Sequence, residues 1–261
     1  MNRMLFRFAI VVAASLIAGA AQANSKVELK EFRADSGNHA SQQRGARNYM
    51  AYCAGCHSMK YLRYSRIAED LQIPEDVLKA NLMFGTDKIG DTIKVAMPAA
   101  SEQWFGRVPP DLSLEGRARG PSWVYTYLQS FYLDPTRPNG VNNTVLPGVS
   151  MPNVLWELQG WQAKAGEHDK TGAAAESGDT SGHDETESEA HHHSGFERVS
   201  QGSLTPEEYR EFVGDITNFM DYAAEPGKHA RLHTGVKVLL FLFVLLILTY
   251  LLKKEFWRDV H

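Results

Sequence analysis

The sequence is poor in cysteine and has no excess of positive charge. Only Cys53 and Cys56 occur among 261 residues, too few and too close together for a disulfide-stapled scaffold. The formal net charge of -4 gives no basic surface of the kind that binds nucleic acid. A phosphate-binding Walker loop and a glycine-rich dinucleotide fingerprint are also missing. Hydrophobic residues make up 43% and charged residues 22%, which is typical of a globular protein and excludes a wholly disordered chain.

The first long apolar run opens the chain. Two arginines precede the apolar stretch 8–18, and an Ala-Gln-Ala triplet that ends at Ala23 follows it. A basic start, a short apolar stretch and small residues at the cleavage positions predict a secretory signal peptide over residues 1–23. A buried N-terminal helix is the alternative, but it would not need the cleavage pattern. We therefore expect a mature chain that starts at Asn24, outside the cytoplasm.

The second long apolar run lies near the other end. Residues 238–252 carry no charge, and a helix over the eighteen residues 235–252 would cover about 27 Å of a bilayer core of about 30 Å. A core helix is rarely apolar on all sides, so a transmembrane helix is the better interpretation. Lysine and arginine are nearly balanced across the span, so the signal peptide sets the orientation. The signal peptide places residues 24–234 outside the cytoplasm and the tail 253–261 in the cytoplasm.

The stretch 163–200 differs in composition from the rest of the chain. It has no aliphatic residue larger than alanine before Val199, and nine acidic residues against three basic ones. Such a stretch buries too little apolar surface to offset the entropy of ordering it, so we predict a flexible acidic insert. His183 and the histidines 191–193 suit a transition metal, but a solvated low-complexity tract is the simpler interpretation.

Apolar periodicity predicts a mainly α domain with long loops. Pro121 is a helix-start signal, and Thr205-Pro206-Glu207-Glu208 has the pattern of a capping box with proline at the first helical position. Val77 is expected on the inward face of its helix, together with Leu78 and Leu82. The segments with helical spacing are 42–52, 61–71, 75–84, 121–131 and 206–223.

The motif that carries chemistry is Cys53-Ala54-Gly55-Cys56-His57, a C-x-x-C-H sequence. Two thiols one helical turn apart can add to both vinyl groups of one porphyrin, and the following histidine can supply an axial imidazole. A thioredoxin-like pair would need a βαβ context, and a zinc site would need two more ligands. The motif therefore predicts one covalently bound haem c held by Cys53, Cys56 and His57.

The sixth iron ligand separates an electron carrier from an enzyme, because methionine closes the iron and an open position admits other ligands. Met97 and Met151 both lie on proline-flanked loops, and residue types alone do not distinguish them. The remaining methionines between the apolar runs either adjoin the attachment motif or have the pattern of core residues: Met50, Met59, Met83 and Met220.

Five separated segments resemble the cytochrome c1 family, the haem c subunits of ubiquinol–cytochrome c reductase (cytochrome bc1) complexes, in its bacterial form. The resemblance covers nearly all of residues 30–261 except the insert, where the family commonly has a shorter link. The segments are Arg44-Gly45 with Tyr49 and the C-x-x-C-H motif, Pro109-Pro110-Asp111-Leu112-Ser113, Arg117-Ala118-Arg119, Gly148-Val149-Ser150-Met151-Pro152, and Tyr222-Ala223-Ala224-Glu225-Pro226 with the following apolar run.

The resemblance implies roles for individual residues. It implies that His57 and Met151 are the axial ligands, in preference to Met97. It implies that the Pro110 carbonyl accepts the His57 Nδ1–H, which fixes the imidazole tautomer. It places Arg119 beside a haem propionate, with a surface arginine as the alternative. Trp123 matches a family aromatic that packs on the haem, although a plain core residue fits it almost equally well.

The resemblance also implies a function. The chain would carry electrons from the Rieske iron–sulfur protein to a periplasmic cytochrome c, with cytochrome b as a further partner, in the bacterial inner membrane. It would be an electron-carrier subunit and no enzyme on its own. The alternatives are a membrane-anchored c-type cytochrome that feeds another oxidase and an open-iron haem enzyme or sensor. The last would need a distal histidine or arginine for acid–base chemistry, and none is recognisable.

Overall fold

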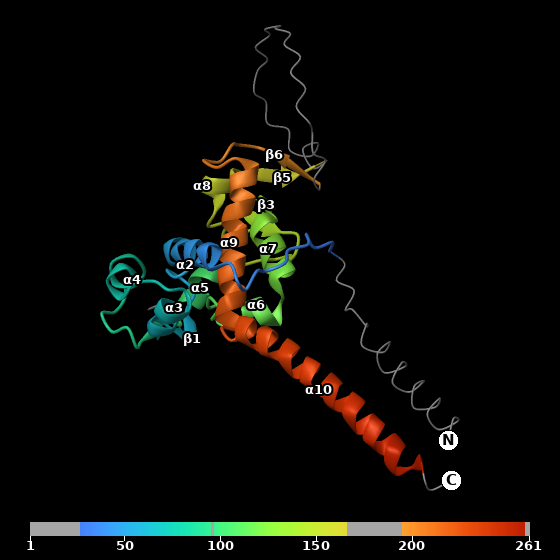
Figure 1. Cartoon of the computed structure of the whole chain (residues 1–261). Helices are drawn as coiled ribbons and strands as arrows, with labels where there is room; N and C mark the ends of the chain where they lie inside the picture. The colour runs from blue at the N-terminus through green and yellow to red at the C-terminus, as the bar shows by residue number, and fades with distance from the viewer. Residues whose placement is uncertain (1–26, 95–96, 166–194, 259–261) are drawn as a thin grey trace, which may run out of the picture.

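Helix α9 (Pro206–Ala224) runs through the middle of the folded domain, and the other elements pack around it (Figure 1). The computed structural model describes residues 27–94, 97–165 and 195–258. The predicted signal peptide, 1–23, and most of the acidic insert lie outside the described residues. The predicted mainly α fold is confirmed. The other helices are α2 (His39–Tyr52), α3 (Tyr64–Asp70), α4 (Glu75–Leu82), α5 (Ser101–Phe105), α6 (Glu115–Ala118), α7 (Pro121–Gln129), α8 (Trp156–Gln159) and α10 (Lys228–Phe256).

The described strands form three antiparallel pairs rather than one sheet. Strand β1 (Met59–Arg63) pairs with β2 (Thr92–Ile93), and β3 (Phe131–Leu133) pairs with β4 (Val141–Asn143). Strand β5 (Gln162–Lys164) pairs with β6 (Phe196–Arg198), which joins the two ends of the predicted flexible insert.

The hairpin β5–β6 corrects the boundaries of the insert. Ala163 lies opposite Glu197 in this pair, and Ala165 N donates to Gly195 O at 2.7 Å. Backbone ladder bonds order these ends, and Phe196 and Lys164 both contact the ring of Tyr132 in β3. Composition does not reveal such contacts with a distant strand. The histidines at 183 and 191–193 lie outside the described residues.

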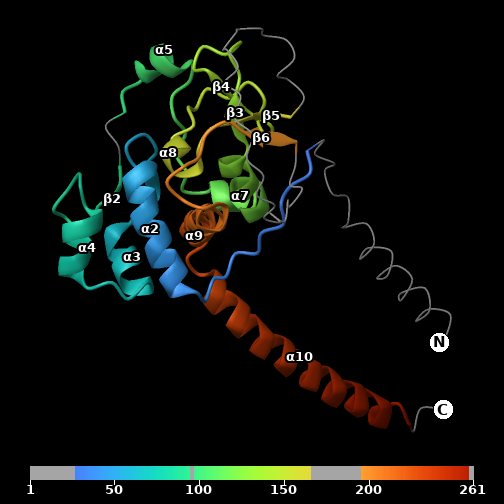
Figure 2. The ribbon, with the colours of Figure 1, turned by 90° about the horizontal axis from the view of Figure 1, so that it is seen from above.

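Two glycines allow α9 to touch its neighbours through backbone. A Cβ built on Gly45 of α2 would lie 2.0 Å from the Asp215 carbonyl oxygen of α9. A Cβ on Gly116 of α6 would lie 2.4 Å from the Met220 carbonyl oxygen of the same helix. Only glycine fits at such distances, so these two positions bring α2 and α6 into direct contact with α9. From above, α2 and α7 lie on different sides of α9 (Figure 2).

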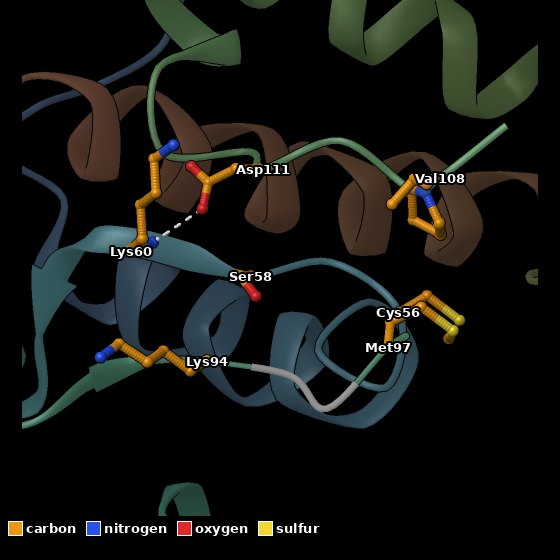
Figure 3. Close-up of a pocket in the computed structure, with 8 residues that line it drawn as sticks. Cys56, Ser58, Lys60, Lys94, Met97, Val108 and Asp111 are labelled. Carbon is orange, nitrogen blue, oxygen red and sulfur yellow. Dashed lines mark hydrogen bonds between the residues drawn. The ribbon is translucent and has the colours of Figure 1, made fainter. Parts of the chain in front are cut away.

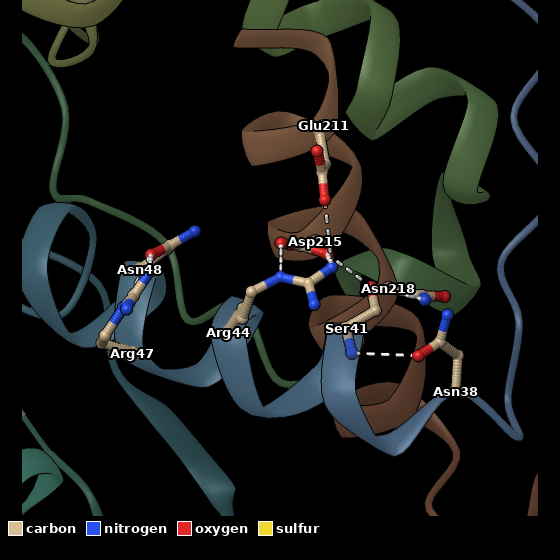
Figure 4. Close-up of polar contacts among 8 residues, drawn as sticks. All are labelled: Asn38, Ser41, Arg44, Arg47, Asn48, Glu211, Asp215 and Asn218. Atoms are coloured by element: carbon tan, nitrogen blue, oxygen red, sulfur yellow. Dashed lines mark hydrogen bonds and ion pairs between the residues drawn. The ribbon is translucent and has the colours of Figure 1, made fainter. Parts of the chain in front are cut away.

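A buried carboxylate joins α2 to α9 (Figure 4). Asp215 is 5% exposed and accepts from Arg44 Nε at 2.6 Å and from Arg44 Nη2 at 2.8 Å. Ser41 Oγ also donates to Asp215 at 2.6 Å, and Asn218 Nδ2 donates to Ser41 Oγ at 3.0 Å. This paired carboxylate raises the pKa of Arg44. Each buried polar group has a partner, so the cluster fixes how α2 sits on α9 without leaving an uncompensated charge.

The predicted helix-start signals are confirmed. Thr205 and Glu208 form both bonds of a capping box, and Pro206 and Pro121 stand in the first turns of their helices. Predicted core residues Met83 and Met220 are buried.

Two local predictions are wrong. The spacing over 61–71 indicated a helix, but its first part belongs to β1, and Tyr61 is 65% exposed. Backbone pairing with distant segments outweighs local periodicity there. Val77 is also exposed, because α4 buries Leu78 and Leu82 and turns Val77 away from the core.

Helix α10 leads away from the folded domain (Figure 1). It has 29 residues and contains the predicted span 235–252; of the described helices, it is the one long and apolar enough to cross a membrane. Its junction with α9 is bridged by Lys228 Nζ to Asp221 at 2.7 Å and by Arg231 Nη2 to Glu225 at 2.7 Å. These ion pairs tie the first turn of α10 to the end of α9.

Candidate haem site

The C-x-x-C-H motif occupies the turn that ends α2. Cys53 N donates to Tyr49 O at 2.8 Å, and His57 N donates to Cys53 O at 2.9 Å. The turn therefore continues the helical bonding and keeps the cysteines one turn apart. Both thiols are free; Cys53 is buried and Cys56 is half-buried. Burial, with a smaller contribution from Cys56, raises the pKa of Cys53 to about 12, so it is a thiol at neutral pH.

His57 is oriented by a backbone carbonyl, as predicted. Its Nδ1 lies 2.7 Å from Pro110 O. A carbonyl only accepts, so the proton is on Nδ1 and the Nε2 lone pair is available to a metal. Burial lowers the pKa of His57 and favours the neutral ring, although the Pro110 carbonyl opposes this shift. Tyr49 Oη donates to His57 O at 2.8 Å and holds the backbone of the same residue.

The loop that carries Pro110 is bound to the segment after the motif. Leu112 N donates to Ser58 O at 2.9 Å, and Lys60 N donates to the Asp111 carboxylate at 2.9 Å. Tyr61 N donates to Ser113 Oγ at 3.2 Å. Figure 3 shows the Asp111 carboxylate turned toward Lys60. These bonds set the position of the Pro110 carbonyl. The sequence analysis did not predict them, although the polar residues Asp111 and Ser113 were a signal for such side-chain hydrogen bonds.

The two candidate methionines lie in different surroundings. Met97 lines a cavity of about 350 Å³ and stands beside Cys56 and Val108 at one end of it, with Lys60 and Asp111 at the other (Figure 3). Met151 is half-buried against the core, and its sulfur accepts a hydrogen bond from Tyr127 Oη at 3.4 Å. The sulfur has a second lone pair, so this bond leaves it able to bind a metal.

Arg119 lies on a row of side chains that leads to Met151. Its Nε is 3.5 Å from Glu115 Oε2, and its guanidinium stands 4.8 Å from the Trp123 ring centroid. Trp123 in turn stacks on Tyr127, with centroids 5.0 Å apart and planes 9° apart. Arg119 is half-exposed, and its fork of five N–H donors leaves some for a further acceptor.

These residues fit a covalently attached haem. Two free thiols stand one turn apart, an imidazole beside them is held in the tautomer that binds a metal through Nε2, and a thioether lies on a separate loop. Groups of three or more His, Cys, Asp or Glu that could hold a bare metal ion are not found in the described ranges. The donors are therefore those of a porphyrin-bound iron rather than of a zinc site.

Comparisons with known proteins show what the chain is similar to. The Cytochrome C1 family model matches residues 31–91 and 197–260. Cytochrome c1 of Allochromatium vinosum is 50% identical over 89% of this chain and 90% of its own length. A protein of Nitrosomonas europaea named ammonia monooxygenase gamma subunit is 40% identical over 90% of both chains. A chain of a solved structure named "Hyperthermophilic respiratory Complex III" has a TM-score of 0.43 and 16% identity, over 98% of this chain and 99% of that chain.

The helical domain, the attachment motif and the apolar C-terminal helix define a c-type cytochrome with a membrane anchor. More narrowly, the chain belongs to the cytochrome c1 family. It is an electron-transfer subunit of a cytochrome bc1 complex and carries covalently bound haem c.

Proposed function

We propose that this subunit takes an electron from the Rieske iron–sulfur protein and passes it to a periplasmic cytochrome c. The bound haem supplies a one-electron change between ferrous and ferric iron. The observation that carries the proposal is the 2.7 Å contact between His57 Nδ1 and Pro110 O, directly after two free cysteines. That contact supports an axial role for the His57 imidazole, because it holds the ring in the tautomer whose Nε2 can bind iron.

We further propose that Cys53 and Cys56 hold the haem, and that His57 and Met151 are its axial ligands. Support for Met151 comes from its half-buried sulfur and from the hydrogen bond that Tyr127 donates to it. Arg119 would pair with a propionate through donors that Glu115 does not use. Such a pair lowers the cost of burying a carboxylate. With both axial positions filled, the subunit carries electrons and is no enzyme on its own.

The arrangement in the membrane is part of the proposal. Residues 1–23 would be a signal peptide, 24–234 a periplasmic domain, 235–252 the inner-membrane span and 253–261 a cytoplasmic tail. Support comes from α10, in which none of the described side chains is buried. An apolar surface of this size needs lipid or another membrane protein to cover it, and we propose that both lipid and cytochrome b do so.

The test compares Met151→Leu with the matched variant Met97→Leu in the assembled complex. Met151→Leu is expected to lose the methionine–iron charge-transfer band and to lower the midpoint potential steeply, because a thioether stabilises ferrous iron. Met97→Leu is expected to keep both. The reverse pattern would overturn the ligand assignment.

Co-purification tests the partners. The solubilised protein should come out of the membrane with cytochrome b and the Rieske protein. Isolation with a terminal oxidase instead would favour the anchored-shuttle alternative, and a ferric haem that readily binds cyanide would favour an open-iron enzyme or sensor.

A further inference from the structure

Tyr127 reaches the sulfur of Met151 from a different part of the chain. Its hydroxyl donates to Met151 Sδ at 3.4 Å, across a loop and a strand pair that separate α7 from residue 151. Tyr127 is 8% exposed, so water does not compete effectively for this hydroxyl. Among the described residues, Tyr127 is the one whose side chain donates a hydrogen bond to the thioether sulfur.

The tyrosine ring is held firmly enough to aim its hydroxyl. Trp123 stacks on one side with centroids 5.0 Å apart, and Phe131 meets the ring edge-on at 5.2 Å and 68°. Asn143 Nδ2 donates to the Tyr127 carbonyl at 2.8 Å and ties the backbone to β4. With ring and backbone both fixed, the direction of the hydroxyl follows from the packing.

The backbone of the loop that carries Met151 is held by hydrogen bonds. Arg137 Nη2 donates to Gly148 O at 3.0 Å, and Gly148 N donates to Asn142 Oδ1 at 2.8 Å. These bonds place the loop but leave rotation about the side-chain bonds of Met151. A flexible thioether has three rotatable bonds, so a directed contact at the sulfur is what selects one rotamer.

We propose that Tyr127 is a positioning residue that fixes the Met151 thioether and raises the reduction potential of the haem. The inference rests on the proposed function, since it takes Met151 as the axial ligand. The hydrogen bond draws electron density from one sulfur lone pair. The other lone pair would then donate less electron density to iron. Weaker donation destabilises the ferric state more than the ferrous state, so the reduction potential rises.

The experiment measures the midpoint potential of Tyr127→Phe in the intact complex. The variant keeps the stacked ring and removes the hydroxyl. We expect the methionine–iron band to remain and the ferrous-to-ferric ratio at a fixed potential to fall about threefold or more. The methyl resonance of the ligating methionine should also shift in the ferrous protein, because the thioether is free to adopt another rotamer.

Tyr125→Phe is the matched control. It removes a hydroxyl from the same helix, two residues away, where the ring stacks on Phe32 at 4.6 Å. Its potential should equal that of the unmodified protein. In a second variant, a ring-fluorinated tyrosine replaces Tyr127 alone. It nearly keeps the shape of the side chain and makes the hydroxyl a stronger hydrogen-bond donor. It should raise the potential, opposite in sign to Tyr127→Phe, even if removal of the hydroxyl impairs folding.

The outcomes separate this inference from the proposed function. Unchanged potentials in both Tyr127 variants, with the methionine band retained, would overturn the role of Tyr127 and leave Met151 as the ligand. A shift of equal size in Tyr125→Phe would overturn it as well. Retention of the band in Met151→Leu would instead overturn the ligand assignment on which the inference rests.

Discussion

Gly45→Ala tests whether the direct contact between α2 and α9 sets the stability of the domain. In an unobstructed helix this change would stabilise by about 1 kcal/mol, because alanine is the better helix former. Here the new Cβ would lie 2.0 Å from Asp215 O and 2.7 Å from Phe219 Cβ. Neither neighbour can swing aside, since one atom is backbone and the other is the first side-chain carbon of the fully buried Phe219. The two helices must therefore separate by about 1 Å, which forfeits much of the dispersion energy between their facing side chains.

The expected size follows from two opposing effects. Overpacking of a closed core costs about 3 kcal/mol at the upper end of its usual range, and the gain in helix propensity returns about 1 kcal/mol. The net destabilisation of about 2 kcal/mol should lower the Tm by about 4–8 °C for a domain of this size.

The assay is thermal unfolding of the detergent-solubilised protein followed by far-UV circular dichroism. Gly214→Ala is the control on α9, since its Cβ would meet the movable edge of Phe32 at 3.2 Å. It should change the Tm much less than Gly45→Ala does. A Gly45→Ala protein that melts at or above the temperature of the unmodified protein would refute the argument.

The remaining predictions concern attachment, capping, the anchor and the insert. Changing Cys53 and Cys56 together to Ser should leave haem extractable by acidified solvent, or give no holoprotein; covalent haem in that variant would contradict the attachment role. Hydrogen bonds from the capping threonine lower the pKa of Glu208 below 4.5, so its contribution to stability should be lost as the pH falls through the lowered value, and Glu208→Gln should remove this pH dependence in acid unfolding curves. Truncation after Glu225 should release a soluble haem domain with an unchanged spectrum; retention in the membrane after a salt wash would point to another anchor. Deletion of 166–194 should slow reduction of a basic cytochrome c at low ionic strength and matter little at high salt, if the acidic charge steers the acceptor; an unchanged rate at low salt would make the insert a passive loop.

Features set within a single turn could be predicted from the sequence. The capping box at Thr205, the proline at the start of α7 and the motif at the end of α2 each depend on residues a few positions apart. The strand β1 could not be predicted in the same way. The backbone amides of Lys60 and Tyr61 donate to side chains of the 111–113 segment, about fifty positions along the chain. These long-range bonds hold the segment extended, although its apolar spacing is that of a helix.

The choice between Met97 and Met151 shows the same limit at the candidate site. Both residues stand before a proline on a loop, so local pattern gives them equal standing. They differ in what distant segments bring to them: Met97 lies beside Cys56 at the cavity, whereas the sulfur of Met151 meets the hydroxyl of Tyr127. A contact between residues from different elements leaves no periodic trace in the sequence, so only family resemblance could separate the two methionines beforehand.

Helix α9 connects these long-range contacts to the membrane. On one side the Arg44–Asp215 cluster holds α2, which ends in the attachment motif and His57. On the other side Tyr209 Oη donates to Leu128 O at 2.9 Å and holds α7, which carries Tyr127. The elements that orient the imidazole and the thioether are thus both fixed to the helix that continues through two ion pairs into α10. Electron transfer depends on where the redox centre lies relative to its partners. Helix α9 packs against both α2 and α7 and leads into the anchor helix, so it fixes the position of the haem site relative to the membrane.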